Sequence, residues 1–304
     1  MAAVEVYHVP VLLHECISAL AIRPDGVYVD ATFGGGGHSR EILNALGPNG
    51  KLVAFDQDQD AARNVPEGDS RILFVPHNFR HLGRFLQLHG IAVIDGLLAD
   101  LGVSSHQFDE GGRGFSTRFA GPLDMRMDQR QTKTAAEVVN TYPEAALHKI
   151  FEQYGEVTNS KTLARTLVAA RSVAPVKTIE GLKAVVAGIV KGAPQKWWAQ
   201  VFQALRIEVN DELGALKELL QTLPSVMKPG GRAAIISFHS VEDRLVKTFF
   251  KQGAFELEDD HPFENIVREK PFMPVNKKPI EASPEEQKRN SRSRSARLRV
   301  AERV

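Results

Sequence analysis

The chain has 304 residues, of which 43% are hydrophobic and 25% are charged, so a wholly disordered chain and a transmembrane bundle are both excluded. Its formal net charge of +1 at pH 7 averages a mixed body with a C-terminal segment in which basic residues outnumber acids from Lys277 onward. The single cysteine, Cys16, rules out an intramolecular disulfide, and residues 1–22 lack the basic start of a signal peptide, so we expect a cytoplasmic protein.

The first hundred residues alternate β-rich segments with helical patterns, which is typical of βαβ units that build a parallel sheet. The predicted strands are residues 27–32, 51–56, 71–76 and 94–100, and the predicted helices between them are residues 39–46, 59–64 and 79–89. The strands are almost continuously apolar, as expected where helices cover both faces of a sheet.

A long interval separates Asp100 from the next predicted strand, residues 232–238, which follows a predicted turn at residues 228–231. Three segments within the interval carry apolar residues at helical spacing, namely residues 143–154, 160–171 and 179–190. Residues 107–131 are rich in glycine and charge and are predicted to form a loop. We therefore predict an α/β fold with an inserted helical subdomain.

Three further elements are predicted near the C-terminus: a long amphipathic helix over residues 203–227, a helix over residues 241–252 and a final strand near residues 296–300. The predicted domain boundaries place the first part of the sheet domain at residues 1–105, the helical insert at residues 106–202 and the second part at residues 203–304.

A glycine-rich loop, Asp-Ala-Thr-Phe-Gly-Gly-Gly-Gly-His-Ser at residues 30–39, follows the first predicted strand. Ligands of open α/β sheets bind at the carboxyl ends of the strands, and glycine lets the backbone approach a ligand closely. Asp56 ends the second strand twenty residues after Gly36, where a carboxylate can accept hydrogen bonds from ribose hydroxyls. Together they predict a nucleoside cofactor, with a tight turn and a helix N-cap as the structural alternatives.

The spacing of the loop favours S-adenosylmethionine over a dinucleotide, because His38, Ser39 and Arg40 stand where a third glycine would admit a pyrophosphate. Phe79, after the third strand, is predicted either to cover the adenine or to be a core residue. Asp100 ends the fourth strand, and a carboxylate there must face the crevice or be paired.

Separate segments in the same order resemble the bacterial small-subunit ribosomal RNA cytosine-N4 methyltransferases called RsmH or MraW, over nearly the whole chain. They are residues 8–15, 30–39, 100–107, 113–116, 121–127, 202–207, 236–240 and 290–295. The resemblance implies a Rossmann-like class I methyltransferase sheet with an all-helical insert that recognises RNA. It implies S-adenosylmethionine-dependent N4-methylation of a cytidine in small-subunit ribosomal RNA.

The resemblance also implies cofactor contacts, at Gly36, Gly37, His38, Asp56, Phe79, Asp100 and Gln107. One segment departs from the family pattern: residues 196–201 read Lys-Trp-Trp-Ala-Gln-Val where the family has His-Pro-Ala-Thr-Arg-Thr. Contacts made by that segment are therefore not carried over to this chain.

Methylation of cytosine N4 requires an acceptor for the amino proton, and Asp100 is the predicted catalytic residue. Neighbours that could orient the base are Ser104, Ser105, Ser237 and His239. Methylation at C5 would need a cysteine nucleophile, whereas Cys16 does not follow a strand and is predicted to be a buried apolar residue. No metal is predicted, because the histidines lack ligand spacing and the displacement needs none.

Arginines of the 107–131 loop and of the tail are predicted to contact RNA, namely Arg113, Arg118, Arg126, Arg292, Arg294 and Arg297. Trp197 and Trp198 are predicted either to stack on bases or to pack in the fold. The expected partner is small-subunit ribosomal RNA within a ribosomal particle, with no membrane, and a homodimer is left open. The rival functions are a non-catalytic RNA-binding factor and a nicotinamide-dependent oxidoreductase.

Overall fold

The computed structural model describes residues 10–255 and 270–304, so His8 and Val9 of the first matching segment lie outside the described residues. The chain forms two compact units, one made of Met1–Gly102 and Gly214–Val304 and the other of Val103–Leu213. Among the described residues no helix is long and apolar enough to cross a membrane.

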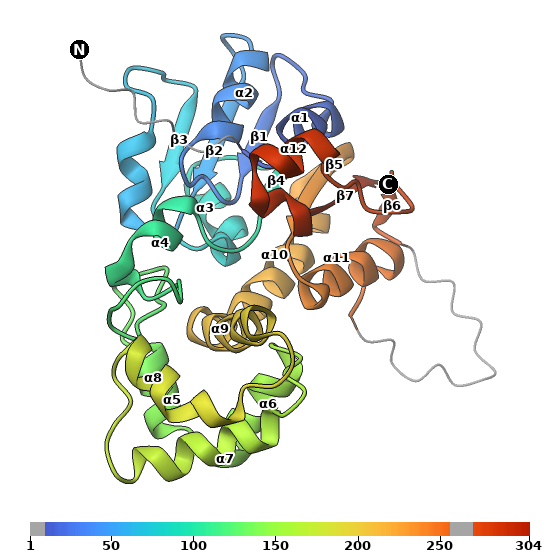
Figure 1. Ribbon diagram of the computed structural model, residues 1–304. Coiled ribbons are helices and arrows are strands. Elements are labelled where there is room, and N and C mark those ends of the chain that lie inside the picture. The colour runs from blue at the N-terminus through green and yellow to red at the C-terminus, as the bar shows by residue number, and fades with distance from the viewer. Residues whose placement is uncertain (1–9, 256–269) are drawn as a thin grey trace, which may run out of the picture. The chain divides into compact units, whose positions relative to one another are not determined.

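A seven-stranded sheet forms the first unit, with strand order β3-β2-β1-β4-β5-β7-β6 (Figure 1). The strands are β1 Val27–Asp30, β2 Lys51–Phe55, β3 Ile72–Val75, β4 Ile94–Asp100, β5 Met227–Ser237, β6 Phe272–Pro274 and β7 Arg297–Arg303. Strands β1 to β5 are parallel, and β7 runs antiparallel to β5 and β6. The order reverses between β1 and β4, which puts the ligand crevice at their carboxyl ends. The predicted Rossmann-like class I methyltransferase sheet is confirmed.

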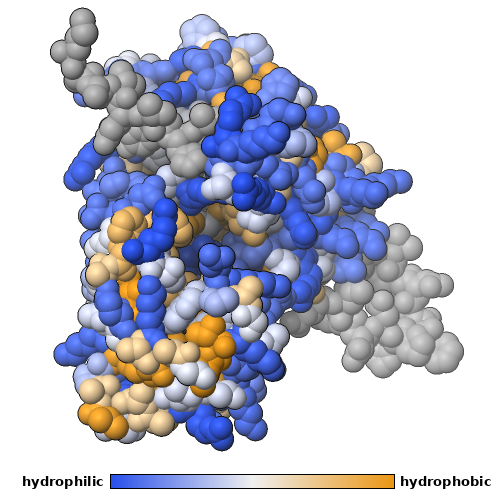
Figure 2. Space-filling model, viewed as in Figure 1, coloured by the Kyte–Doolittle hydropathy of each residue, from blue (hydrophilic) through white to orange (hydrophobic). Residues whose placement is uncertain are grey.

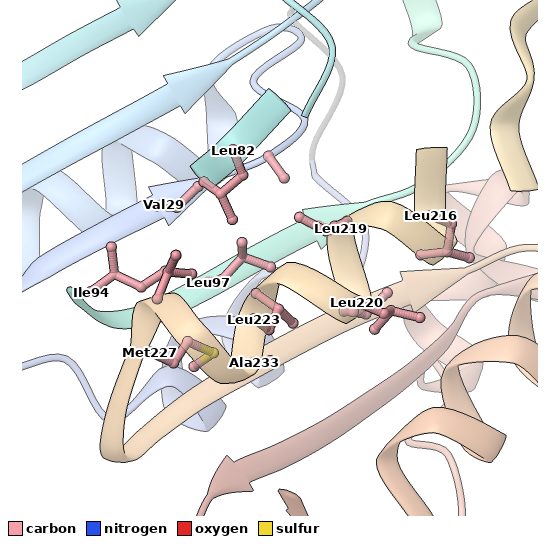
Figure 3. Packing of buried hydrophobic residues seen from close by; sticks show 14 of the residues in the cluster. Val29, Leu82, Ile94, Leu97, Leu216, Leu219, Leu220, Leu223, Met227 and Ala233 are labelled. Atoms are coloured by element: carbon pink, nitrogen blue, oxygen red, sulfur yellow. The ribbon is translucent and has the colours of Figure 1, made fainter. Parts of the chain in front are cut away.

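Helices cover both faces of this sheet because its strands are apolar on both sides. They are α1 Leu13–Leu20, α2 Gly37–Ala45, α3 Leu82–Leu88, α10 Glu212–Val226, α11 Ser240–Gln252 and α12 Pro284–Arg289. On one face, leucines of α10 such as Leu219 and Leu223 pack near Val29 and Leu97 (Figure 3). On the other face, Leu98 belongs to the core that α1 and α2 complete. Adjacent residues of β4 thus serve opposite cores.

The second unit is all-helical apart from its loops, which confirms the predicted insert. Its helices are α4 Ser105–Asp109, α5 Ala135–Thr141, α6 Glu144–Gln153, α7 Ser160–Arg171, α8 Ile179–Val186 and α9 Pro194–Asn210. They enclose a core of their own, in which Leu147, Phe151 and Leu163 are completely buried. Much of the visible surface is hydrophilic, while apolar residues gather over the part that carries α7 and α8 (Figure 2).

Three predicted elements need correction. The helix expected over residues 203–227 is two helices, because Asp211 adopts a left-handed conformation (φ 49°, ψ 44°) that ends α9 one residue before α10 begins. The strand expected over residues 232–238 is assigned from Met227, so β5 includes the predicted turn at residues 228–231, where Gly230 adopts a φ of 78° and the register shifts between the pairs Ile94–Met227 and Gly96–Arg232. The loop expected over residues 107–131 includes most of α4.

Candidate functional site

The glycine loop between β1 and α2 has backbone conformations that favour glycine. Gly34 (φ 51°) and Gly36 (φ 72°) both adopt the left-handed region, which L side chains rarely occupy. A Cβ on Gly36 would also lie 3.0 Å from the ring of Phe33. The close turn predicted from the sequence is therefore present, and it brings the chain directly from β1 into α2.

Gly37 and His38 serve the packing of the N-terminal segment. A Cβ on Gly37 would lie 2.2 Å from Cγ of Pro10, so the missing side chain leaves room for that proline. The ring of His38 is buried, and its Nε2 lies 3.0 Å from the carbonyl oxygen of Val11. The space and the imidazole at these positions are used inside the protein. Cofactor contacts at Gly36, Gly37 and His38 stay predictions.

Asp56, directly after β2, holds the glycine loop. Its Oδ2 accepts a hydrogen bond from the N–H of Gly34 at 2.7 Å, and its Oδ1 accepts one from the N–H of Asp58 at 2.8 Å. Burial raises the pKa of Asp56 to about 7. Each carboxylate oxygen has a further lone pair, so both can accept a ribose hydroxyl while the loop bonds persist.

Asp30 and Thr32 form a buried polar network at the start of the loop. The two oxygens of Asp30 accept hydrogen bonds from the N–H of Thr32 at 3.0 Å and from the hydroxyl of Ser39 at 2.7 Å. Burial raises the pKa of Asp30 to about 6. This carboxylate joins the end of β1 to the first turn of α2. Its role could not be predicted separately, since Asp30 was noted only as part of the matching segment 30–39.

Asp100 ends β4 beside the same network. Its backbone N–H donates to Oγ1 of Thr32 at 2.7 Å, and its side-chain Oδ1 is buried with no hydrogen-bond donor from the described residues. Burial raises the pKa of Asp100 to about 6. A buried carboxylate oxygen without a donor is costly, so this atom is the strongest candidate for contact with a bound molecule.

His239 and Glu242 lie after β5, whose Ile236 pairs with Asp100 across the sheet. Nε2 of His239 is 3.2 Å from Oε1 of Glu242, and Oε2 of Glu242 accepts the N–H of Phe238 at 3.1 Å. Both side chains are buried. Ser237 is buried as well, with its hydroxyl 3.5 Å from the carbonyl of Arg297. A role for Ser237 or His239 in orienting the base stays a prediction.

Phe79 begins the short 3-10 helix Phe79–His81 after β3 and packs half-buried against the core of the sheet, as one of its two predicted roles requires. The preceding Asn78 donates from Nδ2 to Oε1 of Gln57 at 2.8 Å. Gln57 and Asn78 thus join the ends of β2 and β3 beside Asp56. Neither residue was predicted from the sequence, although both lie within three residues of a strand end.

Gln107 belongs to the helical unit, where it caps α4. Its N–H donates to Oγ of Ser104 at 3.2 Å, and its Oε1 accepts the N–H of Ser104 at 3.1 Å. This reciprocal capping box uses the buried amide oxygen of Gln107 within its own helix. A contact between Gln107 and the cofactor, and an orienting role for Ser104 or Ser105, stay predictions.

Arg113 and Arg126 hold the loop of the helical unit together. The buried guanidinium of Arg113 donates to the carbonyls of Arg126 and Met127 at 3.1 and 3.0 Å. Arg126 forms a two-pronged ion pair with Asp124 at 2.9 and 2.7 Å. These contacts favour structural roles for both side chains, and RNA contact by them stays a prediction.

The tail arginines occupy different environments. Arg294 is exposed and Arg292 is half-buried in the 3-10 turn Ser291–Ser295. Arg299 is buried and forms two hydrogen bonds to Asp243, at 2.6 and 3.0 Å, while Arg297 lies 3.4 Å from the same carboxylate. The predicted final strand therefore exists and fixes part of the basic tail against α11.

Two further predictions have a clear outcome. Cys16 is completely buried in the core beside α2, as predicted for an apolar residue. Trp197 is buried and donates from its indole nitrogen to Oδ1 of Asn159 at 2.8 Å, while Trp198 packs edge-on against it. The packing alternative is thus confirmed for Trp197.

Within residues 10–255 and 270–304 no group of three potential metal ligands is placed to bind an ion.

The MraW methylase family matches residues 5–304. The ribosomal RNA small subunit methyltransferase H of Parabacteroides distasonis is 54% identical over 300 residues and covers 98% of each chain. Its counterpart in Flavobacterium johnsoniae is 52% identical over 299 residues, again with 98% of each chain covered. A solved rRNA methylase from Streptococcus thermophilus aligns with 98% of this chain and 99% of its own at 11% identity and a TM-score of 0.42. The match over residues 5–304 and the identities above 50% show that the chain belongs to the MraW methylase family.

Proposed function

We propose that the chain transfers the methyl group of S-adenosylmethionine to N4 of a cytidine in small-subunit ribosomal RNA, within a ribosomal particle in the cytoplasm. Membership of the MraW methylase family supports the reaction class, and the names of the relatives support the RNA. The observation in the structure that carries the proposal is the meeting of Asp56, Asp100 and the glycine loop at the carboxyl ends of β2, β4 and β1. We further propose that residues 106–202 recognise the RNA.

The residues at these strand ends fit S-adenosylmethionine. Both oxygens of Asp56 retain an accepting lone pair for the ribose hydroxyls. Phe79 offers a half-buried ring after β3, where an adenine would lie. The buried Oδ1 of Asp100 lacks a donor from the described residues and can accept one from a bound molecule. The cofactor supplies an electrophilic methyl group on a sulfonium.

Asp100 is the proposed proton acceptor. The lone pair of cytosine N4 is delocalised into the ring, and an acceptor for the amino hydrogen localises it as the new bond forms. With a pKa of about 6 the carboxyl is ionised at neutral pH, yet it is more basic than an exposed aspartate. The surrounding loop contributes mainly by holding the two reactants in line.

The proposal is tested with small ribosomal subunits from cells that lack this gene. Incubation with the purified protein and methyl-labelled S-adenosylmethionine should produce N4-methylcytidine, detected by mass spectrometry of the RNA. Binding of RNA without any methyl transfer would support the rival RNA-binding factor. Calorimetric binding of NAD in place of S-adenosylmethionine would support the oxidoreductase.

A further inference from the structure

The loop after α4 carries Phe119, a residue that is 37% exposed. Every other phenylalanine, tyrosine and tryptophan side chain that the structure describes is buried or half-buried. A single exposed apolar residue is common on protein surfaces and carries no conclusion by itself. The neighbours of Phe119 give it a more specific chemistry.

Arg118 places its guanidinium against two aromatic rings. Its Cζ lies 4.9 Å from the ring centroid of Phe108 and 5.7 Å from that of Phe119. Phe108 is half-buried against the core of the helical unit, whereas the side chain of Arg118 is 61% exposed. We call Phe108, Arg118 and Phe119 the Arg118 platform. It consists of flat groups anchored to a core on one side and open on the other.

The backbone beneath the platform is held in place. The N–H and Nε of Arg118 both contact Oγ of the buried Ser116, at 3.2 and 3.4 Å. The ammonium of Lys183, from α8, donates to the carbonyl oxygen of Thr117. A Cβ on Gly111 would lie 3.1 Å from Cβ of Phe119, so the two chain segments are closely packed. A ligand would thus meet a preformed surface and lose less entropy on binding.

The guanidinium of Arg118 can readily exchange its present ion pair for one with a ligand. The guanidinium of Arg118 lies 3.1 Å from Asp109, but the two side chains are 61% and 64% exposed. An ion pair this exposed contributes little, because water screens it and both side chains lose freedom. A phosphate can therefore replace the carboxylate beside a guanidinium that remains stacked on Phe108.

We propose that the Arg118 platform binds one unpaired nucleotide of the RNA substrate, with the base stacked on Phe119 and its phosphate on the guanidinium. This inference rests on the proposed function. Stacking on an aromatic ring or a guanidinium plane is the usual way in which proteins hold unpaired RNA bases. An apolar partner surface is disfavoured, because the ring lies 5.7 Å from an exposed guanidinium that pairs with an exposed carboxylate.

The first test compares Phe119→Ala with Phe119→Tyr, in the methylation of small ribosomal subunits from cells lacking this gene. Phe119→Ala should raise the KM for subunits about tenfold, as expected for loss of one stacked base, with kcat and the KM for S-adenosylmethionine unchanged. Phe119→Tyr should keep the normal KM. Val173→Ala is the control and should leave the KM for subunits unchanged. Val173 is 89% exposed on the same unit but does not belong to the Arg118 platform.

The second test does not depend on methylation. After subtraction of the wild-type signal, an oligouridine should quench the fluorescence of the tryptophan added in Phe119→Trp. It should not quench the fluorescence of the tryptophan added in Val173→Trp. Equal KM values for wild type and Phe119→Ala, or equal quenching at positions 119 and 173, would overturn the platform. Quenching confined to position 119, in a protein that methylates no RNA, would retain the platform and overturn the proposed function instead.

Discussion

The backbone N–H of Asp100 donates to the hydroxyl oxygen of Thr32 across 2.7 Å. Thr32 lies at the start of the glycine loop after β1, and Asp100 is the last residue of β4. The same Thr32 donates its own N–H to the buried Asp30. Together with the backbone bond from Ala31 N–H to the carbonyl of Leu98, this hydroxyl holds the end of β4, and with it the proposed catalytic carboxylate, against the loop on which the cofactor is expected to lie.

We predict that Thr32→Val lowers kcat about tenfold while leaving the KM for S-adenosylmethionine within about twofold, because the misplaced Asp100 disturbs the reacting geometry more than cofactor binding. Valine has the shape of threonine but leaves the N–H of Asp100 unpaired. Thr32→Ser retains the acceptor and should restore most of kcat. Steady-state kinetics of both variants measure this, and an equally large loss in Thr32→Ser would remove the role of the hydroxyl.

We predict that Asp100→Asn lowers kcat by at least about a hundredfold, in the range typical of a lost general base. Since the pKa of Asp100 is raised to about 6, wild-type activity should fall as the pH drops through that value, because the protonated carboxyl cannot accept the amino proton. Single-turnover rates between pH 5 and 8.5 give the profile. Full turnover by Asp100→Asn with normal cofactor binding would exclude a proton-accepting carboxylate.

Much of the sheet, and the placement of the candidate site residues at the ends of strands, could be predicted because both follow from local pattern. Apolar runs such as the one before Asp100 indicate strands that are buried on both faces. Because these strands alternate with helices along the chain, they are expected to pair in parallel, as they do. Because ligands of such sheets bind at the carboxyl ends of the strands, the residues that follow strands were the candidates, namely Asp56, Phe79 and Asp100. The substrate, by contrast, came from resemblance to a family and from no physical pattern.

The parts that could not be predicted depend on contacts between distant residues. Arg113 looks like a loop arginine in the sequence, yet it is buried because the carbonyls of Arg126 and Met127 turn toward it. The break at Asp211 is hidden because the apolar periodicity continues through both flanking helices. Pro10 fills the space beside Gly37, and the spacing of residues in the sequence does not predict this contact.

We predict that the same Asp100→Asn variant is more stable than wild type at high pH. A folded-state pKa raised above the ordinary value means that folding favours the protonated carboxyl, so stability falls as pH rises from about 4 through about 6. The amide cannot ionise and avoids that loss, which reaches up to about 3 kcal/mol when burial raises the pKa of the carboxyl to about 6. Urea unfolding without cofactor should show a clearly larger gain at pH 8 than at pH 4.5. An equal difference at both pH values would mean that the folded-state pKa is not raised.

We predict that two arginines proposed for RNA contact behave in opposite ways. Arg113→Met should lower the free energy of unfolding by about 2–4 kcal/mol, because the carbonyls of Arg126 and Met127 lose a buried charged donor. Arg294→Ala should leave stability unchanged and weaken RNA binding, reducing the slope of log affinity against log salt by about 1, as expected for one lost phosphate contact.

Urea unfolding and RNA binding at several salt concentrations measure both effects. Arg294 is the matched partner because it is exposed, so its removal changes charge without opening the fold. If Arg113 did bind phosphate, Arg113→Met would reduce the salt slope and leave the urea midpoint unchanged. Burial makes the reverse the expected result: a guanidinium that already gives hydrogen bonds to two carbonyls inside the helical unit would have to give them up to reach an RNA phosphate.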